Sequence, residues 1–147
     1  MQASTTTLFE ENRGQHDERV KFAANISGGA FFLTGSEAVY VLPLNDKYEY
    51  GPEATDKGER QLAYALRMRF ATGHDTQAIG MVLSEKRSNY FRGDEASHWQ
   101  TDVPNYSEVR LSSISDGVDM VWKGRENGTL QYDLHVAPGT DPSGIRL

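Results

Sequence analysis

A chain of 147 residues is the length of one ordinary domain, and with 37% hydrophobic residues it can form a core only from narrow, well-patterned apolar faces. The net charge of −6 argues against nucleic acid as a partner, because phosphate binding needs a clustered basic face. The absence of cysteine excludes disulfides and sulfur-ligated zinc, and no stretch approaches the roughly 20 apolar residues of a membrane span.

The first third of the chain predicts short strands between a polar lead and a loop. Residues 1–8 contain no signal-peptide core and are expected to form the flexible start of a mature protein. Runs rich in β-branched or aromatic residues at 20–24, 30–34 and 38–44 are separated by Gly/Ser turns and predict strands. Residues 45–60 are polar without any period, so they predict a mobile loop.

Alternation of apolar and other residues is clearest in QLAYALRMRF, residues 61–70. A period of two predicts a half-buried strand, and helix is the alternative because these residues also have good helix propensity. The β-rich neighbours favour the strand. Its apolar side would carry Leu62, Tyr64, Leu66, Met68 and Phe70.

The second half of the chain continues the series of short apolar runs. Two layers of strands are the simplest way to bury such narrow faces. We therefore predict an all-β fold, an antiparallel β-sandwich in a single domain over residues 1–147. The further strands are expected at 78–83, 88–91, 106–114, 118–122 and 129–136.

The register of the last hairpin can be predicted from its turn. Asn127-Gly128 is the usual signal of a two-residue turn, but that loop would place Lys123 opposite Tyr132. A three-residue loop places Trp122 opposite Tyr132 instead and makes one face wholly apolar. Because a one-residue slip moves every side chain to the other face, the pattern favours this second register. We predict a type I turn with Gly128 left-handed in a bulge.

Several sequence segments, in their order along the chain, resemble those of a known family. FEENRGQ (9–15), NYFRGDEASHWQTDVPNYSEVRL (89–111) and DGVDMVWKGRENGTLQYDLHVAPGTDP (116–142) are similar to the N-terminal domain that precedes SBBP-type β-propeller repeats in large secreted bacterial proteins. The resemblance implies an extracellular or cell-surface module whose partners are neighbouring domains of the same polypeptide. It implies no enzyme activity and carries over no catalytic residues.

One departure from this family concerns the end of the chain. The resemblance implies further strands after the Pro-Gly-x-Asp-Pro segment, whereas the chain ends at Leu147 within what looks like a strand. This implies either a truncated C-terminal strand or a partner strand from elsewhere, and an unpaired edge there would favour association.

The stretch SNYFRGDEASHW, residues 88–99, contains the adhesion tripeptide Arg92-Gly93-Asp94. A short motif without its structural context is weak evidence of ligation. The resemblance aligns Gly93 with a turn at the end of a strand, where glycine supplies backbone freedom. We therefore interpret the stretch as a corner that positions Trp99.

Aromatic residues are the main candidates for a binding site. Trp99, Tyr106 and Tyr90 could form a platform for a glycan, whereas the hairpin register places Trp122 on the inward, apolar side. The preferred function is a non-catalytic structural or interaction module. Carbohydrate binding around Trp99 is the alternative.

Catalytic and metal motifs are weak in this sequence. The four histidines are far apart, and no Gly-x-Ser-x-Gly or phosphate-binding loop is present. No cofactor is predicted; calcium at Asp141 or the Asp94/Glu95 turn would need a ligand loop whose oxygen spacing is not visible. Acid pairs leave a carboxylate-dependent hydrolase as a weaker alternative. They are Glu10/Glu11, Asp94/Glu95 and Asp116/Asp119.

Overall fold

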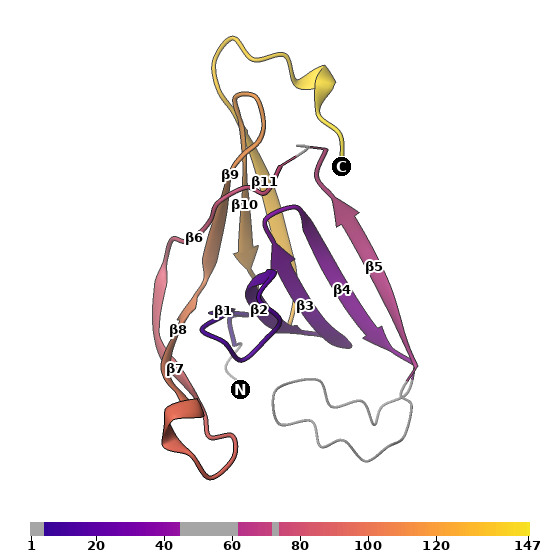
Figure 1. The fold of residues 1–147 in the computed structure, drawn as a ribbon. Coiled ribbons are helices and arrows are strands. Elements are labelled where there is room, and N and C mark those ends of the chain that lie inside the picture. The colour runs from indigo at the N-terminus through magenta and orange to yellow at the C-terminus, as the bar shows by residue number, and fades with distance from the viewer. Residues whose placement is uncertain (1–4, 45–61, 72–73) are drawn as a thin grey trace.

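The computed structural model describes residues 5–44, 62–71 and 74–147, which form two antiparallel sheets (Figure 1). Within these ranges the large sheet has the order β5-β4-β3-β2-β1-β8-β7 and the small sheet the order β11-β10-β9-β6. The strands of the large sheet are β1 (Phe9–Glu11), β2 (Val20–Ile26), β3 (Gly29–Thr34), β4 (Glu37–Pro43), β5 (Ala63–Arg69), β7 (Leu83–Tyr90) and β8 (Gln100–Tyr106). Those of the small sheet are β6 (Ala78–Gly80), β9 (Glu108–Ser115), β10 (Val118–Gly124) and β11 (Leu130–Val136), and the 3-10 turns are η1 (Ala96–His98) and η2 (Pro142–Gly144).

The core lies between the two sheets, which confirms the predicted antiparallel β-sandwich. Phe31 of β3 contacts Trp122 of β10 at a ring-centroid distance of 4.9 Å, so the aromatic centre of the core joins both layers. Both side chains are fully buried. The buried cluster comprises Phe9, Phe22, Ala24, Phe31, Leu33, Ala38, Phe70, Val109, Leu111, Ile114, Val118, Met120 and Trp122.

Two strands of the large sheet were not predicted from the sequence. β1 has three residues, Phe9-Glu10-Glu11, which are too few to show a period. β8 lies between β1 and β7 and contains Pro104, although proline is normally confined to edges and bulges. The predicted strand at 78–83 is divided, because the chain leaves β6 after Gly80 and enters β7 at Leu83.

The β2–β4 part of the large sheet is buried on both faces. Alternation along β3 directs Phe31 into the core and Phe32 to the outer face, yet Phe32 is also buried. The ring of His16 contacts Phe32 edge to face at 5.6 Å, so the segment between β1 and β2 folds over this outer face. A second buried cluster results, formed by Ala23, Ala30, Phe32 and Val39.

The hairpin of β10 and β11 has the predicted register and a different turn. Trp122 pairs with Tyr132, and the amide of Arg125 donates to the carbonyl of Thr129 across the three intervening residues. Gly128 is left-handed, with φ of 72°, but Asn127 also has a positive φ of 60°. Positive φ at both central residues is the signature of a type I′ turn, so the predicted type I turn is wrong. Asparagine tolerates this conformation because its short side chain bonds locally.

The start of the described chain is paired with this hairpin. The amide of Thr7 donates to the carbonyl of Arg125 at 2.8 Å, and Thr6 forms an isolated bridge with Glu126. A side chain at Gly124 would approach the Thr7 carbonyl to 1.6 Å, so glycine permits this contact. Residues 5–7, which fall within the expected flexible lead over 1–8, thus have backbone hydrogen bonds to the hairpin. Residues 1–4, and the expected loop at 45–60, lie outside the described residues.

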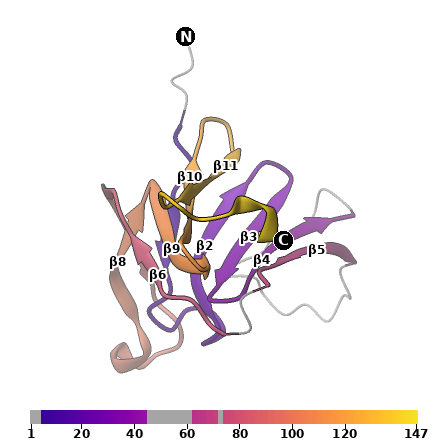
Figure 2. The ribbon, with the colours of Figure 1, turned by 90° about the horizontal axis from the view of Figure 1, so that it is seen from above.

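The sandwich is closed on one side and open on the other (Figures 1 and 2). On the closed side the chain passes between the sheets, where the amide of Met81 donates to Glu108 and that of Ser107 to Val82, each at 2.9 Å. On the opposite side, β5 and β11 are edge strands within the described residues, and each pairs with one neighbour.

The C-terminal residues do not form the expected strand. Asp141 caps η2 by accepting the amide of Ser143 at 2.9 Å, and the segment with its prolines and glycines stays irregular. The carbonyl of Arg146 then accepts the amide of Ala71, just after β5, at 3.4 Å. The segment thus crosses from β11 toward β5 (Figure 2).

Candidate docking groove and the β7–β8 loop

The three aromatic residues predicted as a glycan platform do not lie on one surface. Tyr106 packs on the core side of the large sheet, where its ring contacts Phe22 edge to face at 5.9 Å. Tyr90 is directed to the outer face, where its hydroxyl donates to Glu10. Trp99 precedes β8 and Tyr106 ends it, so they are separated by roughly 20 Å of strand.

Trp99 forms a pair with Phe91 on the loop between β7 and β8. Their ring centroids are 5.2 Å apart with an interplanar angle of 88°. The indole Nε1 donates to the carbonyl of Gly93 at 3.1 Å, and Gly93 is left-handed with φ of 70°. The Arg92-Gly93-Asp94 stretch is therefore the corner that holds the tryptophan. Phe91 remains 64% exposed and Trp99 36% exposed.

A polar network on the outer face explains the FEENRGQ phrase. The side chain of Asn12 donates to the carbonyls of His16, Asp17 and Val20, and accepts amides from the same turn. Gln15 is buried and donates to Glu10 Oε1 at 2.9 Å. This phrase therefore shapes the segment that covers the outer face. Burial lowers the pKa of the His16 imidazole in this segment, against the opposing effect of the nearby Glu10 carboxylate.

The first predicted acid pair, Glu10/Glu11, does not converge on one site. Glu10 and Glu11 are consecutive in β1 and so point to opposite faces. Asp119 accepts from the guanidinium of Arg110 and from the amide of Ser113, and these bonds hold its pKa below the ordinary value. Within the described ranges, no group of three or more histidine and carboxylate side chains is arranged to hold a metal ion.

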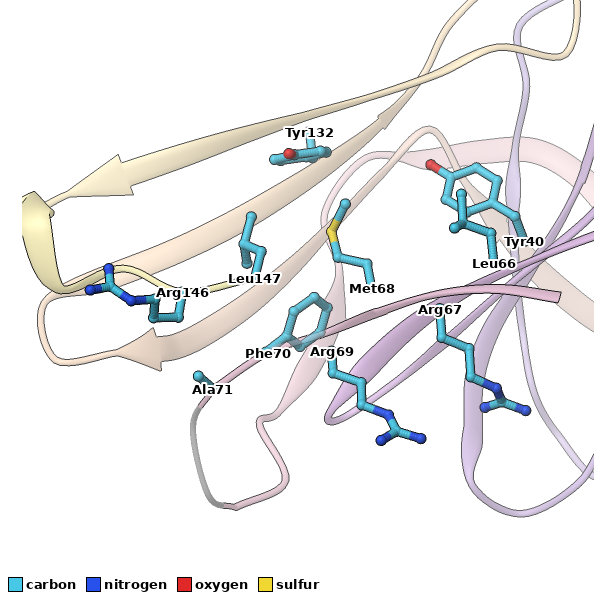
Figure 3. A pocket seen from close by; sticks show the side chains of 10 residues that line it. All are labelled: Tyr40, Leu66, Arg67, Met68, Arg69, Phe70, Ala71, Tyr132, Arg146 and Leu147. Carbon is cyan, nitrogen blue, oxygen red and sulfur yellow. The ribbon is translucent and has the colours of Figure 1, made fainter.

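The open side carries an apolar groove of about 780 Å³ between β4–β5 and β11 (Figure 3). Tyr40, Leu66 and Met68 share the core side of the large sheet, because Tyr40 pairs with Phe31 and Leu66 pairs with Tyr40. Tyr132 faces Met68 from β11, and Leu147 lies on the other side of Met68 from Leu66 in this view (Figure 3). The lining residues are Tyr40, Leu66, Arg67, Met68, Arg69, Phe70, Ala71, Tyr132, Arg146 and Leu147.

The small sheet is too narrow to cover all of β5. Phe70 is buried and Met68 is half-buried, but the rest of the apolar side is exposed. Leu62, Tyr64 and Leu66 are exposed by 69%, 67% and 63%. The predicted half-buried strand is therefore present, but most of its apolar side lies outside the core.

Charge is confined to the other side of β5. The guanidinium groups of Arg67 and Arg69 point away from Leu66 and Met68 (Figure 3). Both form ion pairs with the single carboxylate of Glu37 on β4, the Arg69 pair at 3.4 Å. Within the described ranges the groove lining contains no carboxylate and no histidine.

The sequence did not identify this groove. Alternation in 61–70 predicted an apolar face, but a period of two does not say which strand covers that face. The missing information was the width of the second sheet, which depends on long-range pairing.

These features define an all-β sandwich domain with one open, apolar side. The chain belongs to the family described as Domain of unknown function (DUF7948), whose model matches residues 9–147. No curated protein and no solved structure matches the chain. The described residues include no helix whose length and apolarity would let it span a bilayer.

Proposed function

We propose that the chain is a non-catalytic interaction module of a secreted or surface-displayed modular bacterial protein. The observation that carries the proposal is the open side, where the apolar side of β5 continues the core and no described strand covers it. Contiguous apolar surface of this kind is typical of interaction sites. The module docks a neighbouring part of its own polypeptide there.

Two further points support this proposal. The order of the phrases from FEENRGQ to APGTDP resembles the domain ahead of SBBP-type β-propeller repeats, which makes such repeats the expected neighbours. Among the described residues, the groove lining contains no histidine and no acidic side chain, so binding is the simpler use of the open side.

Hydrogen exchange tests this proposal. The amides of β5 and β11 are compared in the isolated chain and in the longer polypeptide that carries it with its neighbouring domains. Docking predicts slower exchange for both edge strands in the longer polypeptide, with β9 unchanged as the internal control. Equal exchange of β5 and β11 in both forms would contradict docking at the open side.

Carbohydrate binding at the β7–β8 loop is the second candidate, because Phe91 and Trp99 present exposed aromatic rings together. A glycan array with the wild type and the Trp99→Ala variant tests it. Binding that Trp99→Ala abolishes supports this candidate, and the absence of binding by the wild type removes it. Tyr106 is on the core side of the large sheet and is not part of that surface.

A further inference from the structure

We infer that the open side takes an extended polypeptide segment whose side chains alternate between apolar and acidic, added to the edge of β5 as a further strand of the large sheet. This inference rests on the proposed docking function and specifies the chemistry of the occupant. Three features of β5 determine it: its backbone, its apolar side and its charged side.

The backbone of β5 is suited to strand addition. It pairs with β4 without a register shift, from Glu37 opposite Arg69 to Pro43 opposite Ala63. In an antiparallel pair, alternate N–H and C=O groups of an edge strand point away from its partner. β5 contains no proline, bulge or inward-pointing charge, which are devices that block added strands. Extended peptides bind such edges through main-chain hydrogen bonds.

The apolar side of β5 sets one half of the occupant's pattern. Leu62, Tyr64 and Leu66 continue the surface on which Tyr40 packs against Phe31. Every second residue of an added strand would point to this side and cover these three side chains. Those residues must therefore be apolar, because a polar side chain there would lose hydration without gaining a partner.

The charged side of β5 determines the other half of the occupant's residue pattern. Arg67 and Arg69 share the one carboxylate of Glu37, so among the described residues the cationic charge exceeds the anionic charge at this edge. Their side chains are 49% and 78% exposed and remain accessible to a strand laid beside β5. Opposite charges directly across a strand pair stabilise the pairing and like charges oppose it. The outward residues of the occupant are therefore acidic.

A second copy of the chain would match the charges of the β5 edge less well than an acidic segment would. If two β5 strands paired antiparallel about Leu66, Arg67 would lie opposite Ala65 and Arg69 opposite Ala63. That arrangement covers the apolar side but supplies no carboxylate to the arginines. Self-association through β5 is accordingly an outcome that would overturn the inference.

The test uses labelled, capped peptides of about nine residues, a usual strand length, that alternate valine with glutamate or valine with lysine. Fluorescence anisotropy measures their binding to the intact chain. We expect the glutamate peptide to bind at least about tenfold more tightly than the lysine peptide, with the preference reduced by salt.

Variants of β5, with one control on the β7–β8 loop, locate the binding. Leu66→Lys places a charge on the apolar side and should abolish binding, whereas Phe91→Lys, a matched change on the β7–β8 loop, should leave it unchanged. The double variant Arg67→Glu/Arg69→Glu should invert the preference toward the lysine peptide. If that variant does not fold, Arg67→Ala/Arg69→Ala should bring the two affinities close together.

Each other outcome overturns the inference. Equal binding of both peptides, retention of binding in Leu66→Lys, or no binding of the glutamate peptide excludes the acidic alternating strand. Dimers of the chain that Leu66→Lys dissociates would identify a second copy as the occupant. If the peptides do not bind but exchange of β5 and β11 is slowed in the longer polypeptide, the proposal of docking at the open side stands. Only this occupant is then rejected.

Discussion

The hydroxyl of Tyr90 donates to the carboxylate of Glu10, 2.6 Å from Oε1 and 2.7 Å from Oε2. This contact joins the end of β7 to β1 across eighty residues of sequence. It also connects two of the phrases on which the family resemblance rests, FEENRGQ and NYFRGDEASHW. Both phrases therefore have a structural use that is independent of ligand binding.

Tyr90→Phe removes that hydroxyl and tests its contribution. We expect the free energy of unfolding to fall by about 1.5 kcal/mol, the lower end for hydrogen bonds to charged groups, because the pair is only part-buried. Urea unfolding measures the change. Tyr132→Phe is the control, since the tyrosine hydroxyl there has no hydrogen bond to another described residue, and it should change stability little. Equal effects of the two variants would mean that the Glu10 contact contributes nothing.

Gly128→Ala should be strongly destabilising. Alanine would adopt φ of 72° with strain of about 1–2 kcal/mol, and its Cβ would lie 2.4 Å from the amide nitrogen of Ser27. Gly93→Ala is a matched control with φ of 70° and no atom within 4 Å of the new Cβ. Thermal unfolding should show a larger loss for Gly128→Ala, about 3 kcal/mol or more. Similar losses would show that the turn moves away from Ser27 without cost.

The two tryptophans should differ in their importance for stability. Trp122 is fully buried between Phe31 and Tyr132, so Trp122→Ala should cost about 3–5 kcal/mol. Trp99 lies on an exposed loop, and Trp99→Ala should cost about 1 kcal/mol. Chemical denaturation of both variants measures the difference. A larger loss for Trp99→Ala would contradict the assignment of Trp122 to the core.

Asp119 should make stability depend on acid pH. Its folded pKa is lowered, first by the Ser113 amide and then by Arg110, so its stabilising effect is present above the unfolded pKa and is lost as pH falls through the folded value. The loss therefore develops below about pH 4. Asp119→Asn should lower stability at neutral pH by about 1–2 kcal/mol and flatten this dependence. Asp116→Asn, at an exposed neighbour, is the control and should change stability at neutral pH little.

The hairpin shows what the sequence could predict. Its register followed from a single requirement, that Trp122, Met120 and Val118 share one apolar face with their partners on β11. The turn type did not follow, because that requirement constrains pairing and leaves the φ of Asn127 undetermined. Local pattern therefore predicts which residues pair more reliably than how the chain turns between them.

The candidate sites show what the sequence could not predict. Trp99, Tyr90 and Tyr106 are close in sequence, yet strand alternation and the length of β8 distribute them over two faces and two ends. Leu66 and Tyr132, sixty-six residues apart in the chain, line one groove instead. Their approach depends on which strands become the edges of the two sheets, and pairing over such separations is not encoded in any short window.

The covalent crossings at Met81–Val82 and Ser107 have a consequence for how the molecule opens. They tie the two sheets together on one side, whereas β5 and β11 are each held by a single neighbour among the described strands. Fluctuations that separate the layers therefore begin at β5 and β11 and spread toward β8 and β9, because sub-global opening starts where the fewest contacts must break. The two sheets are therefore linked covalently along one side, and the core becomes accessible first on the opposite side, between β5 and β11.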